Sequence, residues 1–416
     1  MSDAQVMAGA APAVIRGTSG HHRVLVIGGG TAGITVAARL RRAGQEDVAL
    51  IEPSDLHYYQ PLWTLVGAGI ADARETVRPM LAVMPAGVHW IRGRAEVIDP
   101  VSRRVALADG RRIGYDFLIV APGIQIDWNA IPGLVDALRT DHVASVYDVR
   151  YAQRMARMVE RFRGGTALFT STSSPVKCGG APQKIMYVSS DTWRRSGVLK
   201  DAHVIFGNAG RVIFAVQPFR DVLTGVVERY GIDVRHQHDL IEVRPRTREA
   251  VFARTEEPGW EPVTIGYDLL HVTPRMSAPD FLKNGPLTAD DPLGWVAIDK
   301  HTMQHPRYPE IFSLGDACNA PTARTGAAIR KQAPVVVENL RAVMAGREPT
   351  AKYDGYSSCP LLTARNRMLL AEFDYDQQPA PSIPFLNTFK ERYSMYLLKR
   401  YGLPLLYWHG MLKGRA

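Results

Sequence analysis

The sequence predicts an α/β protein with two successive βαβ domains and a distinct C-terminal region. A glycine-rich turn follows a short apolar run near the N-terminus, and a second α/β pattern begins near Gly165. After Tyr353 the chain becomes aromatic and basic. With 46% hydrophobic and 22% charged residues, the 416-residue chain has a composition typical of globular proteins, which excludes a disordered, collagen-like or coiled-coil chain.

The elements follow in order along the chain. In the first domain, buried parallel strands are predicted at 23–27, 48–51 and 117–120, a helix at 34–42, and antiparallel strands around 88–105. In the second domain, strands are predicted at 166–169, 203–206 and 269–272. A strand at 311–314 and a helix at 325–344 are expected to return to the first domain.

The first turn carries a dinucleotide fingerprint. Gly28, Gly30 and Gly33 lie between a predicted strand and a helix, and Glu52 follows Gly33 by nineteen residues. The first glycine permits a tight turn, the second lets backbone amides approach a pyrophosphate, and the third lets helix and strand pack closely. Glu52 is expected to accept hydrogen bonds from ribose hydroxyls. Together with the second α/β pattern, this turn predicts two Rossmann-like domains, each with three-layer ββα architecture.

Two further features favour FAD over NAD as the cofactor. A strand that ends in Gly-Asp at Asp316 and is followed by a helix is a feature of flavoproteins related to disulfide reductases. The Ala-Pro-Gly turn that ends at Gly123 resembles the Ala-Thr-Gly turn of the same class. Residues 207–211 take the expected position of a nicotinamide fingerprint, but their spacing is wrong. NAD(P)H is therefore a poor candidate as electron donor.

The three cysteines are too few and too far apart for a disulfide framework or a zinc cluster, so no metal is expected. Cys178 lies in a glycine-rich turn before a predicted helix, where the helix N-terminus, Lys177 and Lys184 would lower the thiol pKa. Cys359 lies on a turn 181 residues later and could be its partner. Cys318 is expected to pack beside the cofactor.

The sequence resembles the sulfide:quinone oxidoreductases of the mitochondrial type over nearly its whole length. The matching stretches are 48–69, 176–187, 270–274, 353–360, 374–375 and 394–397. The resemblance implies that Cys178 and Cys359 are the redox-active pair, with the persulfide on Cys359 and the flavin-facing thiolate on Cys178. Lys184 is a candidate for holding negative charge near the sulfurs.

The resemblance also implies which residues contact FAD and which partners the protein has. The matching FAD-contact positions are Thr31, Ala32, Glu52, Gln60, Ala95, Asp316 and Arg324. At Arg324 the mitochondrial pattern has Lys, and a guanidinium does not reproduce an ammonium contact. No counterpart of the third cysteine of other branches is found, so FAD is expected to bind non-covalently. The implied partners are sulfide, quinone and a small nucleophilic sulfur acceptor.

The C-terminal segment predicts attachment to a membrane surface. The apolar residues that recur at three- and four-residue spacing are Phe385, Phe389, Tyr393, Tyr396 and Leu397. Residues 380–416 hold six Lys and Arg against one acid, a net +5 within a total of +9. A basic amphipathic helix of this kind is typical of a monotopic anchor, although a terminal helix packed on the core has the same pattern.

These observations give five segments. They are a flexible leader at 1–21, the FAD-binding domain at 22–145 and 291–352, the second domain at 146–290, and a quinone and membrane region at 353–416.

No secretory signal or spanning helix is expected, which predicts a peripheral protein on the cytoplasmic face of a bacterial inner membrane. Nucleic acid is not an expected partner, and homo-oligomerisation is left open. The alternatives are a type II NADH:quinone dehydrogenase and a non-enzymatic flavin or thiol redox sensor.

Overall fold

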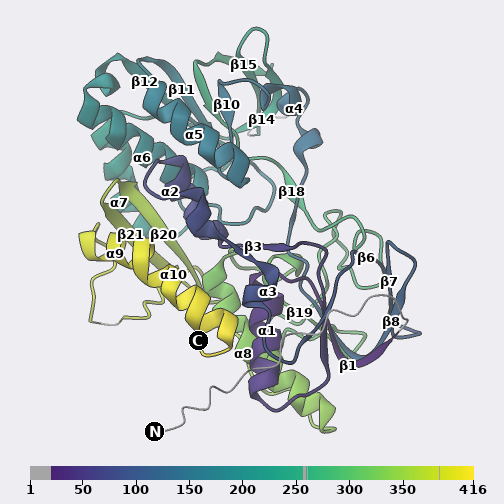
Figure 1. The fold of residues 1–416 in the computed structure, drawn as a ribbon. Helices are drawn as coiled ribbons and strands as arrows, with labels where there is room; N and C mark the ends of the chain where they lie inside the picture. Colours follow the sequence, from purple (N-terminus) through teal and green to yellow (C-terminus); the bar gives the residue numbers. More distant parts are fainter. Residues whose placement is uncertain (1–19, 256–258, 260, 384) are drawn as a thin grey trace, which may run out of the picture.

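The computed structural model describes residues 20–255, 259, 261–383 and 385–416. The predicted leader falls almost entirely outside these ranges. The chain forms two α/β lobes, and the C-terminal segment, yellow in Figure 1, lies against both. Each lobe contains a mainly parallel sheet with helices packed on it, which is typical of two dinucleotide-binding domains.

The first sheet combines strands from the N-terminal part of the chain with one much later strand, β19. Its parallel strands are β5 (His89–Ile91), β2 (Val48–Ile51), β1 (His21–Ile27), β8 (Arg112–Val120) and β19 (Ile311–Ser313). The antiparallel strands β7 (Arg104–Leu107) and β6 (Ala95–Asp99) extend it beyond β8. Helices α1 (Thr31–Arg42) and α8 (Gly326–Met344) pack against one another. The late strand and helix therefore return to the first domain as expected, because β19 completes the sheet beside β8.

The second sheet is parallel throughout. Its order is β10 (Val143–Ala144), β17 (Leu269–His271), β11 (Gly165–Thr170), β12 (Ala202–Asn208) and β13 (Asp233–His236). Its helices are α5 (Val149–Arg161), α6 (Ala181–Ser196) and α7 (Gln217–Tyr230). An antiparallel sheet of β14 (His238–Arg244), β15 (Glu249–Arg254) and β16 (Val263–Gly266) adjoins it.

Short elements connect these layers. The helices are α2 (Trp63–Gly67), α3 (Met80–Val83) and α4 (Leu134–Ala137), and the strand pairs are β3 (Leu56–Tyr58) with β4 (Val77–Pro79) and β9 (Gln125–Ile126) with β18 (Met276–Ser277). The largest buried apolar cluster runs from α1 and α8 through α2 and α6 to the C-terminal hairpin. Both lobes therefore share one continuous core.

The position of the second βα turn corrects one prediction. β11 is the central strand of the second sheet and leads through α6 to β12, so the turn after β11 corresponds to the fingerprint turn after β1. Residues 207–211, which were expected at that turn, instead form the end of β12 and the turn directly after it. In the first domain three residues separate strand from helix, whereas ten residues, 171–180, separate β11 from α6. This longer loop lacks the glycine fingerprint and carries Cys178.

The C-terminal region forms a hairpin followed by a helical run. Strands β20 (Ser357–Ala364) and β21 (Arg367–Phe373) pair, and β20 packs on α6. The helical run consists of α9 (Tyr393–Leu397), a π-helical turn η6 (Leu398–Gly402), α10 (Leu403–Leu405), a second π-helical turn η7 (Leu406–Gly410) and η8 (Met411–Lys413). The helix predicted from Phe385 onward is therefore too long, because Phe385 and Phe389 precede it; Phe389 instead packs on Phe219, with ring centroids 5.0 Å apart.

A buried chain of hydrogen bonds joins this helical run to the fingerprint turn. Burial lowers the pKa of His57 to about 4, so the ring is neutral. Its Nδ1 donates to the carbonyl oxygen of Gly29 at 2.9 Å, which leaves Nε2 to accept from the Tyr407 hydroxyl at 2.5 Å. Thr31 Oγ1 lies 3.0 Å from the same hydroxyl. The C-terminal run is thus attached to the first βα turn.

Replacing Tyr407 with Phe is expected to lower the midpoint of thermal unfolding. Leaving the buried His57 Nε2 without its donor costs about 1–2 kcal/mol. Tyr401→Phe is the matched control, since Tyr401 is 56% exposed on the same helical run. Equal midpoints for the two variants in calorimetry would contradict this role of Tyr407.

Candidate functional site

The glycines of the first turn have the geometry that the fingerprint requires. Gly28 has φ +102°, and a Cβ on Gly33 would overlap the carbonyl oxygen of Gly28. Gly30 instead faces open space, and no side chain caps the N-terminus of α1. The first-turn residues Thr31 and Ala32 therefore leave backbone N–H groups free to meet an anion.

Glu52 lies at the end of β2 beside this turn. Its Oε2 accepts from the Gly29 N–H at 2.7 Å and its Oε1 accepts from the Ser54 N–H at 2.7 Å. Burial raises the pKa of the Glu52 carboxyl, opposed by these hydrogen bonds and by the charge of Arg94. Ala95, at the buried start of β6, follows Arg94 directly. Glu52 is thus held beside the turn where the ribose was predicted, and a contact of Ala95 with the cofactor remains a prediction.

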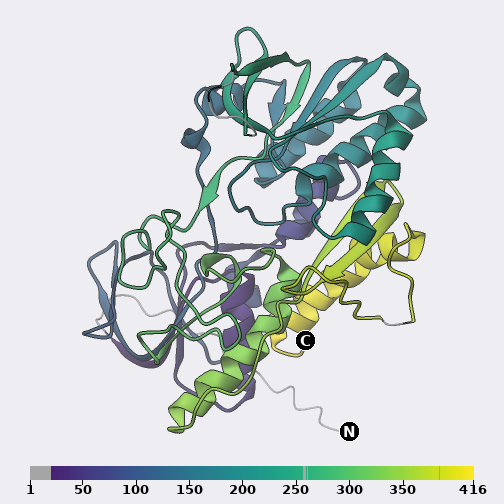
Figure 2. The same cartoon turned by 180° about the vertical axis from the view of Figure 1, so that it is seen from behind.

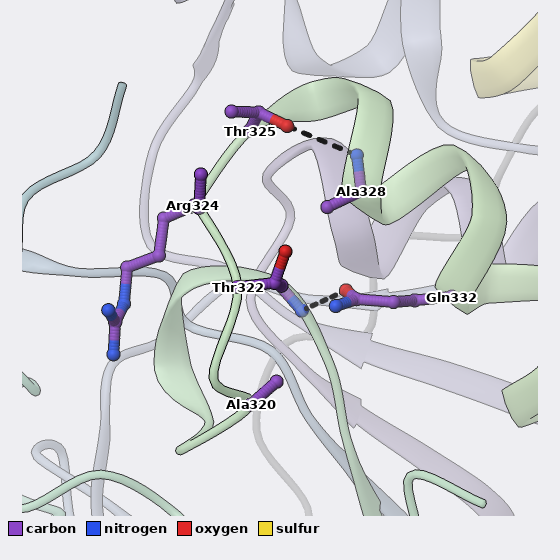
Figure 3. A pocket seen from close by; sticks show the side chains of 8 residues that line it. Ala320, Thr322, Arg324, Thr325, Ala328 and Gln332 are labelled. Carbon is purple, nitrogen blue, oxygen red and sulfur yellow. Dashed lines mark hydrogen bonds between the residues drawn. The ribbon is translucent and has the colours of Figure 1, made fainter. Parts of the chain in front are cut away.

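The second predicted cofactor segment lies at the N-terminus of α8. A narrow pocket there is lined by Gly315, Ala320, Thr322, Ala323, Arg324, Thr325, Ala328 and Gln332 (Figure 3). Thr325 caps the helix by accepting from the Ala328 N–H at 3.2 Å. Burial raises the pKa of the Asp316 carboxyl, and the charge of Lys177 opposes this. The half-buried carboxylate of Asp316 and the N-terminus of α8 are therefore parts of the same segment.

Arg324 holds the backbone of this segment together. Its Nε donates to the carbonyl oxygen of Asp316 at 3.1 Å, and a terminal nitrogen donates to that of Cys318 at 3.3 Å. The guanidinium carbon lies 4.0 Å from the centroid of the Trp295 ring. The side chain thus positions the Gly-Asp turn, a role that the sequence did not suggest.

These features fit the predicted FAD. The open turn at Gly30, the carboxylate of Glu52, and the half-buried carboxylate of Asp316 lie at the carboxyl ends of parallel strands of one sheet, where dinucleotides bind. Gly123 follows β8 at the same edge with φ +81°. Gln60 is exposed in the turn η1 (Gln60–Leu62), next to Pro61, and its contact with FAD remains a prediction.

The loop after β11 holds Cys178 in a strained conformation. Cys178 has φ +53°, in the left-handed region that non-glycine residues rarely adopt. Its N–H donates to the carbonyl oxygen of Arg324 at 2.9 Å, and its own carbonyl oxygen accepts from the Tyr147 hydroxyl at 3.2 Å. Helix α6 begins three residues later. The loop is therefore joined directly to the predicted cofactor segment.

The structure brings Cys178 and Cys359 together. Cys359 projects from β20, and the two thiols are within hydrogen-bonding contact. Gly180 permits this approach, because a Cβ there would overlap the sulfur of Cys359. A hydrogen bond from Cys359 lowers the pKa of Cys178 well below its usual value, and the same bond raises that of Cys359. These contacts favour negative charge on Cys178 rather than on Cys359.

Lys184 supplies the matching positive charge. Its ammonium lies 3.0 Å from the Cys178 sulfur, and the side chain is only 2% exposed. Burial by itself lowers the pKa of Lys184, but the negative charge of the two sulfurs outweighs it and the pKa rises. Lys184 thus remains protonated beside the thiolate.

A second buried lysine near the sulfurs was missed by sequence reasoning. Lys399 lies on the C-terminal helical run, is 2% exposed, and donates to the carbonyl oxygen of Pro61 at 3.2 Å. Burial and the charge of Lys184 lower its pKa to about 7, opposed by the two cysteines. Lys399 is one of the six basic residues on which the predicted basic amphipathic helix rests. Its spacing of four from the buried Met395 places it on the inner helix face and could have revealed it.

A family model described as pyridine nucleotide-disulphide oxidoreductase matches residues 22–161. The fold and this match define a flavoprotein of the disulfide-reductase class. The chain is 45% identical to the mitochondrial sulfide:quinone oxidoreductase of Mus musculus, over 95% of this chain and 87% of that protein. It is 38% identical to the mitochondrial sulfide:quinone oxidoreductase of Dictyostelium discoideum, over 94% of this chain and 86% of that protein. The chain therefore belongs to the sulfide:quinone oxidoreductase family, and it is an enzyme that passes electrons from sulfide to quinone.

A solved structure supports the fold. The sulfide:quinone oxidoreductase from Aquifex aeolicus superposes with a TM-score of 0.80 at 17% identity, covering 95% of this chain and 92% of that chain. The predicted family, activity and class of flavoprotein are thus confirmed. The roles of individual residues remain predictions.

Gly30→Ala is expected to weaken FAD binding at least ~10-fold while the apoprotein unfolds at an unchanged temperature. The new methyl group meets no protein atom within 4 Å, so only a ligand at the turn would be displaced. Gly225→Ala on α7, where a Cβ also meets open space, is the matched control. Titration of apoprotein with FAD measures both, and equal affinities would show that the cofactor does not approach Gly30.

Lys184→Met is expected to raise the pKa of the Cys178 thiol, because the thiolate loses its adjacent cation. The pH midpoint of iodoacetamide alkylation of Cys178, followed by peptide mass spectrometry, should move upward, and the rate at pH 7 should fall several-fold. Lys200→Met, at an exposed position of the same domain, should change neither. An unchanged midpoint in Lys184→Met would refute the ion pair.

Proposed function

We propose that Cys178 and Cys359 form the redox pair that oxidises sulfide. In the oxidised pair, hydrosulfide attacks the Cys359 sulfur; the bond between the two cysteines breaks, leaving a persulfide on Cys359 and a thiolate on Cys178. A small nucleophilic acceptor removes the outer sulfur and leaves a second thiolate. The disulfide then re-forms as two electrons pass to the cofactor and onward to quinone. The observation that carries this proposal is the Lys184 ammonium beside two sulfurs in contact.

The surrounding residues prepare this chemistry. Lys184 stabilises Cys178 as the leaving thiolate, which directs sulfide to Cys359. Below pH 7 Lys399 adds a second positive charge, which attracts hydrosulfide; this charge is lost as the pH rises through its pKa of about 7. The hydrogen bond from Tyr147 and that to Arg324 hold the Cys178 backbone in its left-handed conformation.

FAD, when bound, supplies the two-electron acceptor that links the thiols to quinone. We propose that Gly28, Gly30, Gly33 and Glu52 hold its pyrophosphate and ribose, and that Asp316 and Gly123 hold the remainder. We expect this binding to be non-covalent, because the third cysteine of other branches has no counterpart and the remaining cysteine, Cys318, is buried. Burial raises the pKa of Cys318 to about 11, and its sulfur donates to the Gly315 carbonyl oxygen.

Cys178→Ser and Cys359→Ser should each abolish bleaching of the flavin absorbance by sulfide under anaerobic conditions, while FAD stays bound. Cys318→Ser is the matched control and should keep both the bleaching and its recovery on adding a short-chain quinone. Retained sulfide turnover in either of the first two variants would refute the paired role. Bleaching of the unaltered protein by NADH but not by sulfide would favour the NADH dehydrogenase alternative.

We further propose peripheral attachment to a membrane through the C-terminal helical run. The exposed apolar side chains recur every four residues along it: Tyr393 (58% exposed), Leu397 (37%), Tyr401 (56%) and Leu405 (61%). They form one exposed apolar stripe, of the kind that inserts into the interface of a bilayer. The basic face is smaller than the composition suggests, because Lys399 is buried and Arg400 pairs with Glu75 at 2.7 Å. Among the described residues no helix is long and apolar enough to cross a bilayer.

The double variant Leu397→Asp/Leu405→Asp is expected to reduce sedimentation with liposomes at least ~10-fold, since burial of each Leu contributes about 1.5–3 kcal/mol. Leu81→Asp/Val101→Asp is the matched control, because these residues are 51% and 86% exposed in the first domain. A similar decrease of sedimentation in both double variants would show that the membrane contact lies elsewhere or is nonspecific.

A further inference from the structure

Helix α5 carries a row of arginines. Arg150, Arg154, Arg157 and Arg161 follow one another at spacings of four, three and four, which places them along one side of the helix. Beside the C-terminal half of α5 lies a cavity of about 320 Å³. Its lining residues are Asp141, His142, Arg154, Arg157, Met158, Arg161, Phe162, Arg163, Gly164, Arg248, Asp268 and Leu269. We call it the arginine groove.

The positive charge of the arginine groove is only partly used by the protein. Arg154 donates to the carbonyl oxygens of Leu138 and Thr140, and Arg163 to those of Glu160 and Phe162. These are neutral acceptors, so the charges of both arginines remain unneutralised.

Carboxylates compensate little of this charge. Arg248 is 4.0 Å from Asp268, whose carboxylate also accepts from the Thr166 N–H. Within the described part of the chain, Arg157 and Arg161 have no hydrogen-bond or ion-pair partner. Five guanidinium groups therefore face two carboxylates, Asp141 and Asp268.

The arginine groove is separate from the redox site. Strands β10, β11 and β17 are parallel, and the groove adjoins their amino-terminal ends at His142, Gly164 and Leu269. The loop with Cys178 follows the opposite, carboxyl end of β11. A ligand in the groove would therefore not be a substrate of the cysteine pair.

We propose that the arginine groove binds an organic phosphate of nucleotide size. Guanidinium groups bind phosphate oxygens through two parallel hydrogen bonds, and Arg157 and Arg161 are free to do so. Met158, Phe162 and Leu269 provide an apolar floor for the organic part. The volume of about 320 Å³ lies at the lower end of the range for small-molecule sites, larger than one phosphate requires.

Calorimetric titration of the FAD-loaded protein tests this proposal, with ADP and inorganic pyrophosphate as the probes at low ionic strength. Both should bind, and the double variant Arg157→Gln/Arg161→Gln should bind at least ~10-fold more weakly, because two charged hydrogen-bonding groups are lost. The matched control is Arg112→Gln/Arg246→Gln, which removes the same charge from exposed positions outside the groove. Sulfide-dependent activity without the probes should be unchanged in both.

Vesicles that contain phosphatidylglycerol provide a second arm, because a lipid headgroup carries the same phosphate chemistry. If the protein binds these vesicles through the groove but binds neither ADP nor pyrophosphate, the proposal is overturned. It is also overturned if no probe binds, or if both double variants lose the same affinity for the probes. If the double variant unfolds at a lower temperature, the single variant Arg161→Gln is used in its place, because Arg161 is exposed in the last turn of α5. An unaltered affinity of that single variant for ADP would refute the site.

Discussion

The contact between the buried Lys184 ammonium and the Cys178 sulfur is the interaction on which the arrangement of the molecule depends. A charge removed from water costs several kcal/mol unless an opposite charge lies beside it, so this lysine and a thiolate require one another. Their site needs three distant parts of the chain: the loop after β11, strand β20 with Cys359, and the helical run that brings Lys399. The continuous core that joins both lobes to the C-terminal hairpin holds these parts in place.

The two domains use the same topological position for different chemistry. In the first, the short turn between β1 and α1 leaves backbone N–H groups open at Gly30. In the second, the corresponding turn between β11 and α6 is longer and carries Cys178 three residues before the helix. Both positions lie at the carboxyl end of a parallel strand and the N-terminus of a helix, where negative charge is stabilised. A pyrophosphate suits the first position and a thiolate the second.

Much of the fold was predictable because its signals are local. The apolar runs that became β1, β2, β8, β11, β12 and β19 are buried parallel strands, and the glycine turn has the expected geometry. The errors arose where a long-range neighbour decides. Residues 207–211 were misassigned because strand order, not spacing, identifies the central strand of a sheet. Phe389 follows the helical periodicity, yet it packs on Phe219 of α7 before the helix begins.

The sequence by itself determined the family, the dinucleotide turn and the two candidate cysteines, because these depend on residues close together in the chain or on long matching stretches. Only the tertiary structure decided that Cys178 and Cys359 touch and that the surroundings of Cys178 favour negative charge there. It also decided that Arg324 supports the Gly-Asp turn and that Lys399 is buried beside the sulfurs. The physical reason is that pKa values and ion pairs depend on distance and burial, and these are set by packing between segments far apart in the sequence.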